Sequence, residues 1–340
     1  MDNEKNFIIT LSGEPASGKS TTYAKLKEHF EAEGYEVVKY STGKIFRDFA
    51  QKWIDKNPGK KLADFNTYVE SHPEVDTLID DELKNIGIRL QNNYHPDKVF
   101  IIDSRMAWNF IPNSMSVRLI IDEKIAGQRV FNDSTRNSED TYNTVQEATE
   151  STIIRKRSEK QRYMNLYGVD LENEDNYDLV IDTSYTNKDD VVDVIYKCAH
   201  LYMDNKDFSK TWKNPRYFLP TQDIRQSISH VDEYSDSISK YGFYPYESIS
   251  SVNVDGYNYV VDGHNRTGAA IKTDTSLIPY TCIAKDDEIM DQDLIAKLSA
   301  RRFVKDEYTP GRAYDFEDCF GFRYTDVYDA YPKQPELDER

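Results

Sequence analysis

Eight consecutive residues near the start of the chain have the spacing of a phosphate-binding loop. Residues 13–20, GEPASGKS, match G-x-x-x-x-G-K-[ST]. Glycines let backbone N–H groups curl around phosphates, Lys19 brings a positive charge to the β and γ oxygens, and the Ser20 hydroxyl can ligate Mg²⁺. The alternative is a glycine-rich turn with an incidental lysine, but such a turn would not need a strand before it and a helix after it. We therefore expect ATP and Mg²⁺ as cofactors. The expected nucleotide-binding residues are Gly13, Ala16, Ser17, Gly18, Lys19, Ser20 and Thr21.

Two further polar groups follow predicted strands and could bind the molecule that accepts the phosphate. Asp103 offers a carboxylate for the metal, and Arg105 offers a guanidinium for an acceptor phosphate. Ser41 and Arg47 lie just past another strand, where a second ligand would face the loop. Helix caps and surface ion pairs are the alternatives for each residue alone. Together with the phosphate loop, these two groups make three polar features at successive strand ends, which favours a site.

An arginine-rich segment between the fourth and fifth predicted strands has the properties of a lid. Arg155, Glu159 and Arg162 are spaced i, i+4, i+7, which places them on one face of a helix. A solvated helix with salt bridges is the alternative, but a lid at this position would supply arginine to the transferring phosphoryl group. The expected catalytic residues are Lys19, Asp103, Arg155 and Arg162, and the expected metal ligands are Ser20 and Asp103.

The elements that must position these residues alternate between strand and helix. Short apolar runs predict strands at 7–11, 36–40, 98–102, 117–121 and 179–181, and helices are expected at 21–30, 44–55 and 189–201. Strands separated by helices pair in parallel and carry helices on both faces. We therefore predict an α/β fold of the P-loop type, with its function at the carboxyl ends of the strands.

A second, smaller α+β domain is expected after a change of composition. Two alternating runs, 251–254 and 257–261, are joined through Asp-Gly and predict a hairpin. The string DGHNR at 262–266 then opens a helix, a geometry suited to anions. The predicted boundaries are a first domain at 1–203, a linker at 204–216, a second domain at 217–332 and a disordered tail at 333–340.

Over roughly residues 5–200 the chain resembles the cytidylate kinases, and more closely their compact archaeal-type branch. The resemblance rests on residues 13–20, 41–43, 45–47, 72–76 with Asp80, 158–159, 162–163, 167–170 and 177–184.

This resemblance implies phosphoryl transfer from ATP to CMP or dCMP and a role for each matching residue. Arg47 and Arg105 would hold the monophosphate; Ser41, with Asp76 or Asp80, would face the cytidine; Arg155, Glu159 and Arg162 would form the lid. The sequence departs from the family at Ser104, where Gly is usual, and at Lys156, where an acidic residue is usual. The bulk of Ser104 bears on the acceptor rather than on phosphotransfer.

The second domain is similar to the ParB and sulfiredoxin superfamily, which includes free-serine kinases, over about residues 215–285. Its expected site residues are Asp262, Gly263, His264 and Arg266. His264 stands where sulfiredoxins have their catalytic cysteine, which argues against sulfur chemistry. Nucleotide binding or phosphorylation of a small metabolite such as serine remains, beside the alternative that Asp262 and Arg266 pair structurally. A nucleotide sensor in which neither domain turns over is a further hypothesis.

Composition limits the partners. The 340 residues carry a formal net charge of −17, which repels polyanions, so we expect small nucleotide substrates rather than nucleic acid. An uninterrupted apolar stretch long enough to span a membrane is absent, as is the layout of a signal peptide. Three widely spaced cysteines argue against a disulfide framework or a zinc site. We expect a cytoplasmic enzyme, and the sequence says nothing of its oligomeric state.

Overall fold

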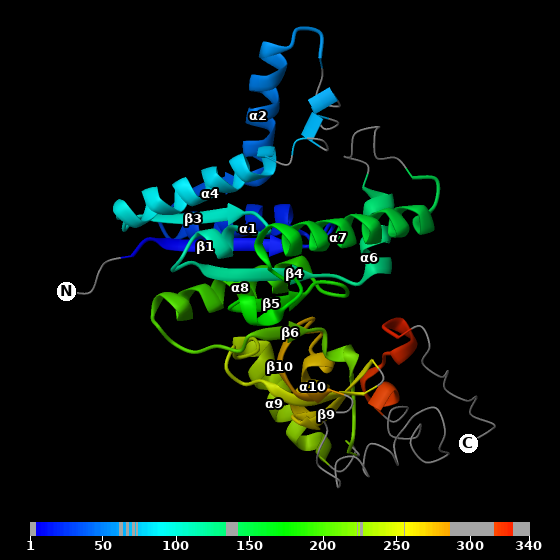
Figure 1. The fold of residues 1–340 in the computed structure, drawn as a ribbon. Coiled ribbons are helices and arrows are strands. Elements are labelled where there is room, and N and C mark those ends of the chain that lie inside the picture. Colours follow the sequence, from blue (N-terminus) through cyan, green and yellow to red (C-terminus); the bar gives the residue numbers. More distant parts are fainter. Residues whose placement is uncertain are drawn as a thin grey trace. The chain divides into compact units, whose positions relative to one another are not determined.

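The computed structural model describes residues 5–60, 64–65, 68–69, 72, 74–133, 142–222, 224, 227–254, 256–285 and 316–328 (Figure 1). Of Asp76 only the backbone is described. The chain divides into two compact units: Met1–Val180 with Tyr202–Asn205, and Ile181–Leu201 with Lys206–Arg340.

Strands and helices alternate along the first unit and into the start of the second. In chain order they are β1 (Phe7–Gly13), α1 (Lys19–Ala32), β2 (Glu36–Ser41), α2 (Thr42–Lys56), α4 (Glu74–Asn92), β3 (Lys98–Asp103), α5 (Ala107–Phe110), β4 (Met115–Ile120), α6 (Glu123–Asn132), α7 (Val145–Tyr167), the 3₁₀ turn η2 (Glu174–Asn176), β5 (Leu179–Asp182) and α8 (Lys188–Met203).

The sheet of the first unit is parallel, as predicted. Its strand order includes β2-β3-β1-β4, with β1 parallel to both β3 and β4, and β2 parallel to β3. Asp103 of β3 is in register with Leu11 of β1 and with Ser41 of β2. Parallel strands point the same way, so the ends of β1, β2 and β3 meet at one edge of the sheet.

Helices cover both faces of this sheet. Successive strand residues point to opposite faces, and Phe7 and Ile8 of β1 illustrate this. Ile8 lies in a buried cluster with Leu83, Ile86 and Leu90 of α4. The ring centroid of Phe7 lies 5.6 Å from that of Phe30 in α1. The apolar spacing along α4 is that of a helix with one buried face.

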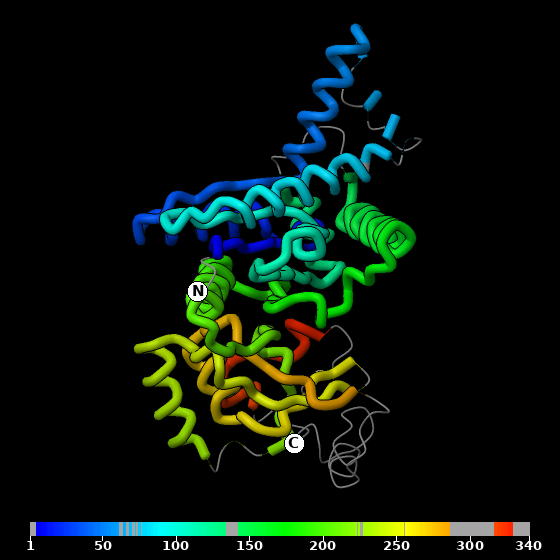
Figure 2. The backbone as a smooth tube through the Cα atoms, turned by 60° about the vertical axis from the view of Figure 1, so that its left-hand side comes forward, coloured from blue at the N-terminus to red at the C-terminus, as the bar shows by residue number. Residues whose placement is uncertain are grey.

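Helix α2 projects from the sheet in both views (Figures 1 and 2). It is stabilised by an aromatic cluster in which Phe65 contacts Phe46 and Trp53, with ring centroids 5.3 and 5.6 Å apart. This cluster supports the segment that follows Ser41, from which the acceptor-binding residues were predicted.

The second unit has a mixed sheet. After α8 its elements are β6 (Thr211–Lys213), η3 (Pro215–Tyr217), β7 (Phe218–Leu219), α9 (Ile228–Tyr241), β8 (Ile249–Val254), β9 (Tyr257–Asp262), α10 (His264–Lys272), β10 (Ile278–Lys285) and η6 (Tyr324–Asp326). The order is β6-β10-β8-β9-β7. β8 and β9 form the predicted antiparallel hairpin, while β10 and β8 pair in parallel.

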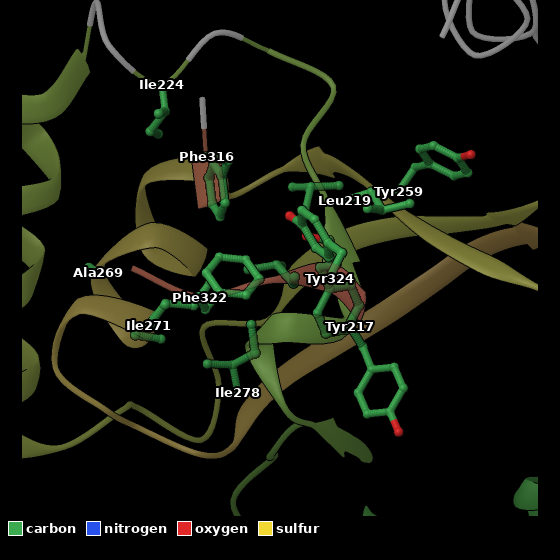
Figure 3. Close-up of a cluster of buried hydrophobic side chains, with 14 of the residues drawn as sticks. Tyr217, Leu219, Ile224, Tyr259, Ala269, Ile271, Ile278, Phe316, Phe322 and Tyr324 are labelled. Carbon is green, nitrogen blue, oxygen red and sulfur yellow. The ribbon is translucent and has the colours of Figure 1, made fainter. Parts of the chain in front are cut away.

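The core of the second unit includes side chains from the last described segment of the chain. Phe316, Phe322 and Tyr324 belong to the same buried cluster as Ile271 and Ile278, and Phe322 lies next to Ile271 (Figure 3). The Tyr324 hydroxyl donates a hydrogen bond of 3.0 Å to the carbonyl of Phe218. Residues 316–328 are therefore part of the fold rather than an appendage.

The segment predicted as a linker, 204–216, contains ordered structure. Within it, β6 pairs antiparallel with β10, and the Trp212 side chain is buried. The contacts also group residues 181–201 with the second unit, although the first domain was expected to reach 203. The predicted tail at 333–340 lies outside the described residues. In the part of the chain that the structure describes, no helix has the length and apolar character needed to cross a membrane.

Candidate active site

The predicted phosphate loop connects β1 to α1 as a tight turn. Ala16 and Gly18 both have positive φ, at 62° and 89°. The backbone N–H and the hydroxyl of Ser17 donate to the carbonyl of Glu14, at 3.2 and 2.8 Å. Ser20 and Thr21 are exposed in the first turn of α1.

Gly13 is required by close packing. A Cβ atom at this position would lie 2.7 Å from Ser17 Oγ and 2.8 Å from the carbonyl oxygen of Leu119 in β4. Because backbone atoms cannot move aside easily, a side chain here would open the turn.

Lys19 folds back onto the loop. Its Nζ donates to the carbonyls of Gly13 at 2.7 Å and Glu14 at 3.2 Å. Burial, and secondly the charge of Arg105, lower the Lys19 pKa to about 8, while Asp103 and Glu159 act in the opposite direction. Lys19 therefore interacts electrostatically with Asp103 and Arg105 at the end of β3.

Arg105 is bound by a carboxylate of the lid helix. Glu159 Oε1 lies 2.6 Å from Arg105 Nη1 and 3.1 Å from Arg155 Nε, so one oxygen accepts from two guanidiniums. Burial lowers the Arg105 pKa, and Glu159 opposes that shift. The structure therefore brings Lys19, Asp103, Arg105, Arg155 and Glu159 together.

Arg162 and Asp80 meet a group of tyrosines. Arg162 Nη2 donates to the Tyr163 hydroxyl at 3.2 Å, and its guanidinium lies 4.9 Å from the centre of that ring. The Tyr167 hydroxyl donates to the buried carboxylate of Asp80. The rings of Tyr163 and Tyr167 are stacked, with centroids 6.4 Å apart. These contacts join the predicted lid to a predicted acceptor residue.

The remaining acceptor residues lie around the start of α2. Ser41 is the last residue of β2, and Arg47 is exposed on the next turn of the helix. A Cβ at Gly43 would lie 3.6 Å from Ser41 Oγ and 3.5 Å from Arg47 Nη1. Both polar groups therefore lie close to Gly43, while the predicted side-chain role of Asp76 lies outside the described atoms.

The loop contains an ion-pair cluster that was not predicted from the sequence. Glu14 Oε1 lies 3.1 Å from Lys156 Nζ and 3.3 Å from Arg118 Nη2. With Arg105 and Glu159, these residues line a cavity of about 30 Å³ beside the loop. Arg118 could have been noticed in the sequence, because it is the one charged residue in the otherwise apolar run 117–121 and a buried charge needs a partner.

The residues expected to hold Mg²⁺ fit that ion chemically. Ser20 is exposed, Asp103 is half-buried, and hydroxyl and carboxylate oxygens are the hard ligands that Mg²⁺ prefers. Asp103 also lies 4.0 Å from Lys39. Among the described residues, no group of three or more His, Cys, Asp or Glu side chains could hold a metal. Nucleotide phosphates and water would have to complete the coordination.

In the second unit the predicted site residues have partners within the protein. Arg266 pairs with Asp262 at 2.9 Å and donates to the carbonyls of Glu247 and Ser248, both at 3.1 Å. The buried His264 accepts at Nε2 from the Thr221 N–H, at 3.0 Å.

Gly263 meets a packing requirement in the same turn. Its φ is 100°, and a Cβ here would lie 2.5 Å from Ile249 Cγ2. The pairing of Asp262 with Arg266 is the structural alternative that the sequence had left open. A site at Asp262, Gly263, His264 and Arg266 stays a prediction.

Comparisons with known proteins concern mainly the first unit. A family model described as "Cytidylate kinase-like family" matches residues 8–185. A cytidylate kinase of Archaeoglobus fulgidus is 30% identical over 194 residues, which are 57% of this chain and 94% of that protein. A cytidylate kinase of Pyrococcus furiosus is 32% identical over 198 residues, which are 58% of this chain and 90% of that protein.

A relative of a different kind also matches. An S-adenosylmethionine-dependent nucleotide dehydratase of Lacinutrix mariniflava is 31% identical over 189 residues, which are 55% of this chain and only 34% of that protein. Most of that relative therefore has no counterpart in the matched region.

Proposed function

The chain belongs to the cytidylate kinase-like family through residues 8–185, and on that premise we propose that its first unit transfers the γ-phosphate of ATP to a nucleoside monophosphate, with CMP or dCMP as the acceptor. The observation that carries this proposal is the meeting of Lys19, Arg105 and the lid carboxylate Glu159 at the ends of two adjacent parallel strands.

The proposed reaction is a displacement at the γ-phosphorus. An oxygen of the acceptor monophosphate attacks the γ-phosphorus while the bond to the β–γ bridging oxygen breaks, and its electron pair leaves with ADP. Lys19 neutralises charge on the β and γ oxygens. Ser20 and Asp103 would hold Mg²⁺, which would neutralise part of the negative charge of the triphosphate.

We propose that Arg105 and Arg47 bind the acceptor phosphate. Glu159 supports this role, because its oxygen accepts from the guanidiniums of Arg105 and Arg155 as a phosphate oxygen would. An incoming monophosphate would replace this carboxylate on Arg105. Arg155 and Arg162 would then stabilise the charge that develops during transfer.

The preference for cytidine is proposed for Ser41, Asp76 and Asp80. The Asp80 carboxylate is buried and accepts from Tyr167, so it is held in a fixed position. Fixed polar groups discriminate between bases because an unmatched base would leave them unpaired. The buried Ser104, beside the acceptor-binding Arg105, also bears on which monophosphate fits.

Two other functions stay as hypotheses. Phosphorylation of a serine-like metabolite would require the Asp262 to Arg266 motif, whose described side chains are engaged internally. A non-catalytic nucleotide sensor would not require lid arginines at the acceptor site. The geometry around Arg105 therefore favours turnover in the first unit.

A panel of nucleoside monophosphates and small hydroxyl metabolites, assayed for ATP consumption by the full chain, tests the proposal. CMP or dCMP should give the highest kcat/KM. Lys19→Ala should lower turnover by a factor on the order of 10³, because it removes charge stabilisation of the phosphoryl group. Lys27→Ala is the matched control, since Lys27 lies on the exposed side of the same helix and pairs with Glu31. Full CMP activity in Lys19→Ala would place the chemistry elsewhere.

A further inference from the structure

Glu14 puts a carboxylate inside the loop that would bind the triphosphate. Its side chain is 12% exposed. Its backbone carbonyl accepts from Lys19 Nζ at 3.2 Å, so the residue lies beside the phosphate site. A negative charge here repels a bound polyphosphate, and partial burial leaves that repulsion poorly screened. Nucleotide binding at this loop therefore needs a means of neutralising Glu14.

Arg118 is the first cation on Glu14 and is fixed in place. It is 5% exposed in β4 and donates to the carbonyl of Leu171 and, at 3.2 Å, to the Tyr177 hydroxyl. Its guanidinium lies 3.3 Å from Glu14 Oε1. Arg118 is therefore held in a fixed position beside the loop carboxylate.

Lys156 is the second cation and comes from the lid helix. Besides Glu14 at 3.1 Å, its Nζ lies 3.4 Å from Glu172 and 4.0 Å from Glu123. Burial alone would lower the Lys156 pKa, but Glu14 and Glu172 raise it overall, so the ammonium stays charged. Lys156 thus connects α7 to the loop directly, one residue after Arg155.

We propose that Lys156 is a positioning residue of the phosphotransfer site: it holds the Glu14 carboxylate on the lid side of the loop, so that the triphosphate binds without a repelling charge. The inference rests on the proposed function only through nucleotide binding at this loop, and it does not depend on which monophosphate is the acceptor. The cavity of about 30 Å³ beside these residues has room for a few water molecules rather than for a nucleotide.

The test is calorimetry with Mg·ATP, without acceptor, on the full chain. Lys156→Met keeps the length of the side chain but removes its charge, and it should weaken ATP binding roughly tenfold. Glu14→Gln in the same protein removes the repelling charge, so the double variant should bind within about twofold of wild type. Lys156→Arg keeps the cation and should bind as wild type does.

Lys160→Met is the matched control. Lys160 lies one turn further along α7 and pairs with Glu172 and Asp170. Lys160→Met should raise the Kd for Mg·ATP less than Lys156→Met does. Adding Glu14→Gln to Lys160→Met should not restore the affinity. Thermal unfolding of each variant establishes that it is folded.

Two results would overturn the inference. One is an unchanged Kd in Lys156→Met, and the other is a double variant that binds as weakly as Lys156→Met alone. Wild-type protein that binds ATP but phosphorylates no nucleoside monophosphate would refute the proposed acceptor and leave this inference standing. Wild-type protein that binds no ATP would refute both.

Discussion

At the scale of single residues, Lys19 couples nucleotide binding to pH. Burial and the nearby Arg105 lower its pKa to about 8 in the ligand-free protein. Phosphate groups stabilise the ammonium form and raise the pKa again. Binding therefore takes up a proton once the pH exceeds 8, and affinity falls as the pH rises further.

We predict that the Kd for Mg·ATP increases between pH 8 and pH 9.5, approaching about tenfold per pH unit. Calorimetry in buffers with different ionisation enthalpies measures both the affinity and the proton uptake. Lys19→Met has no titrating group at this position, so its weaker binding should not change over the same range. Proton release on binding would contradict the prediction.

Glu317 is a second residue whose ionisation affects the protein. Its side chain is buried, one oxygen accepts from the Tyr324 N–H at 2.7 Å, and Oε2 has no hydrogen-bond partner within the structure that is described. Burial raises the Glu317 pKa. The folded state therefore holds a proton over a pH range in which the unfolded chain has lost it.

We predict that the free energy of unfolding of the second unit falls as the pH rises through that range, by about 1.4 kcal/mol for each unit of the shift. Trp212 is buried in this unit, and the other tryptophans, Trp53 and Trp108, belong to the first. Urea unfolding at pH 5 and pH 8, followed by Trp212 fluorescence in a Trp53→Phe, Trp108→Phe background, measures it. Glu317→Gln should flatten the difference. If the free energy of unfolding depends equally on pH with Glu317 and with Gln at this position, other groups cause the dependence.

At the scale of elements, helix α7 carries the predicted lid. We predict that Arg162→Ala lowers kcat about 10²-fold or more and changes the acceptor KM much less, if this arginine meets the phosphoryl group mainly in the transition state. Arg157→Ala is the matched control, since Arg157 is exposed on the same helix and is not among the predicted lid residues. Steady-state kinetics with varied CMP decide between the roles. An unchanged kcat would make Arg162 a surface residue that stacks on Tyr163.

Elements whose signal is local could be predicted from the sequence. Strands β1, β3 and β4 are largely buried in a parallel sheet and appear as apolar runs, and the loop at 13–20 is contiguous. The short strand β6 could not be predicted, because three residues acquire their strand geometry from pairing with β10. Helix α4 was not predicted as an element, although Ile79, Leu83, Ile86 and Leu90 carry its period.

The candidate site was predictable to the same extent. The loop and the residues after β3 follow strand ends, which sequence patterns mark. The cluster of Glu14, Arg118 and Lys156 joins three elements far apart in the chain. Without the fold, each of these residues reads only as an isolated charge.

At the scale of the whole molecule, the two units can be distinguished by ligand. We predict that Mg·ATP at a hundredfold excess over its Kd stabilises the first unit by about 2.7 kcal/mol. In a Trp53→Phe, Trp212→Phe variant, the fluorescence of Trp108 should report the stabilised unfolding transition. In a Trp53→Phe, Trp108→Phe variant, the fluorescence of Trp212 should report no shift. If ATP shifts the Trp212 transition even in a Lys19→Ala protein, the second unit has a nucleotide site of its own.

The segment 316–328 has a consequence for how the polypeptide can be divided. It is bound to the second unit by buried rings and by hydrogen bonds from Tyr324 and Tyr328 to the carbonyls of Phe218 and Tyr217. A protease site engineered between residues 285 and 316 would yield two pieces that remain associated without a covalent link. Conversely, a stop codon after residue 285 would remove Phe316, Phe322 and Tyr324 from the interior, and the shortened product should aggregate. We therefore expect the second unit to assemble from two fragments, and to lose its fold when residues 316–328 are removed.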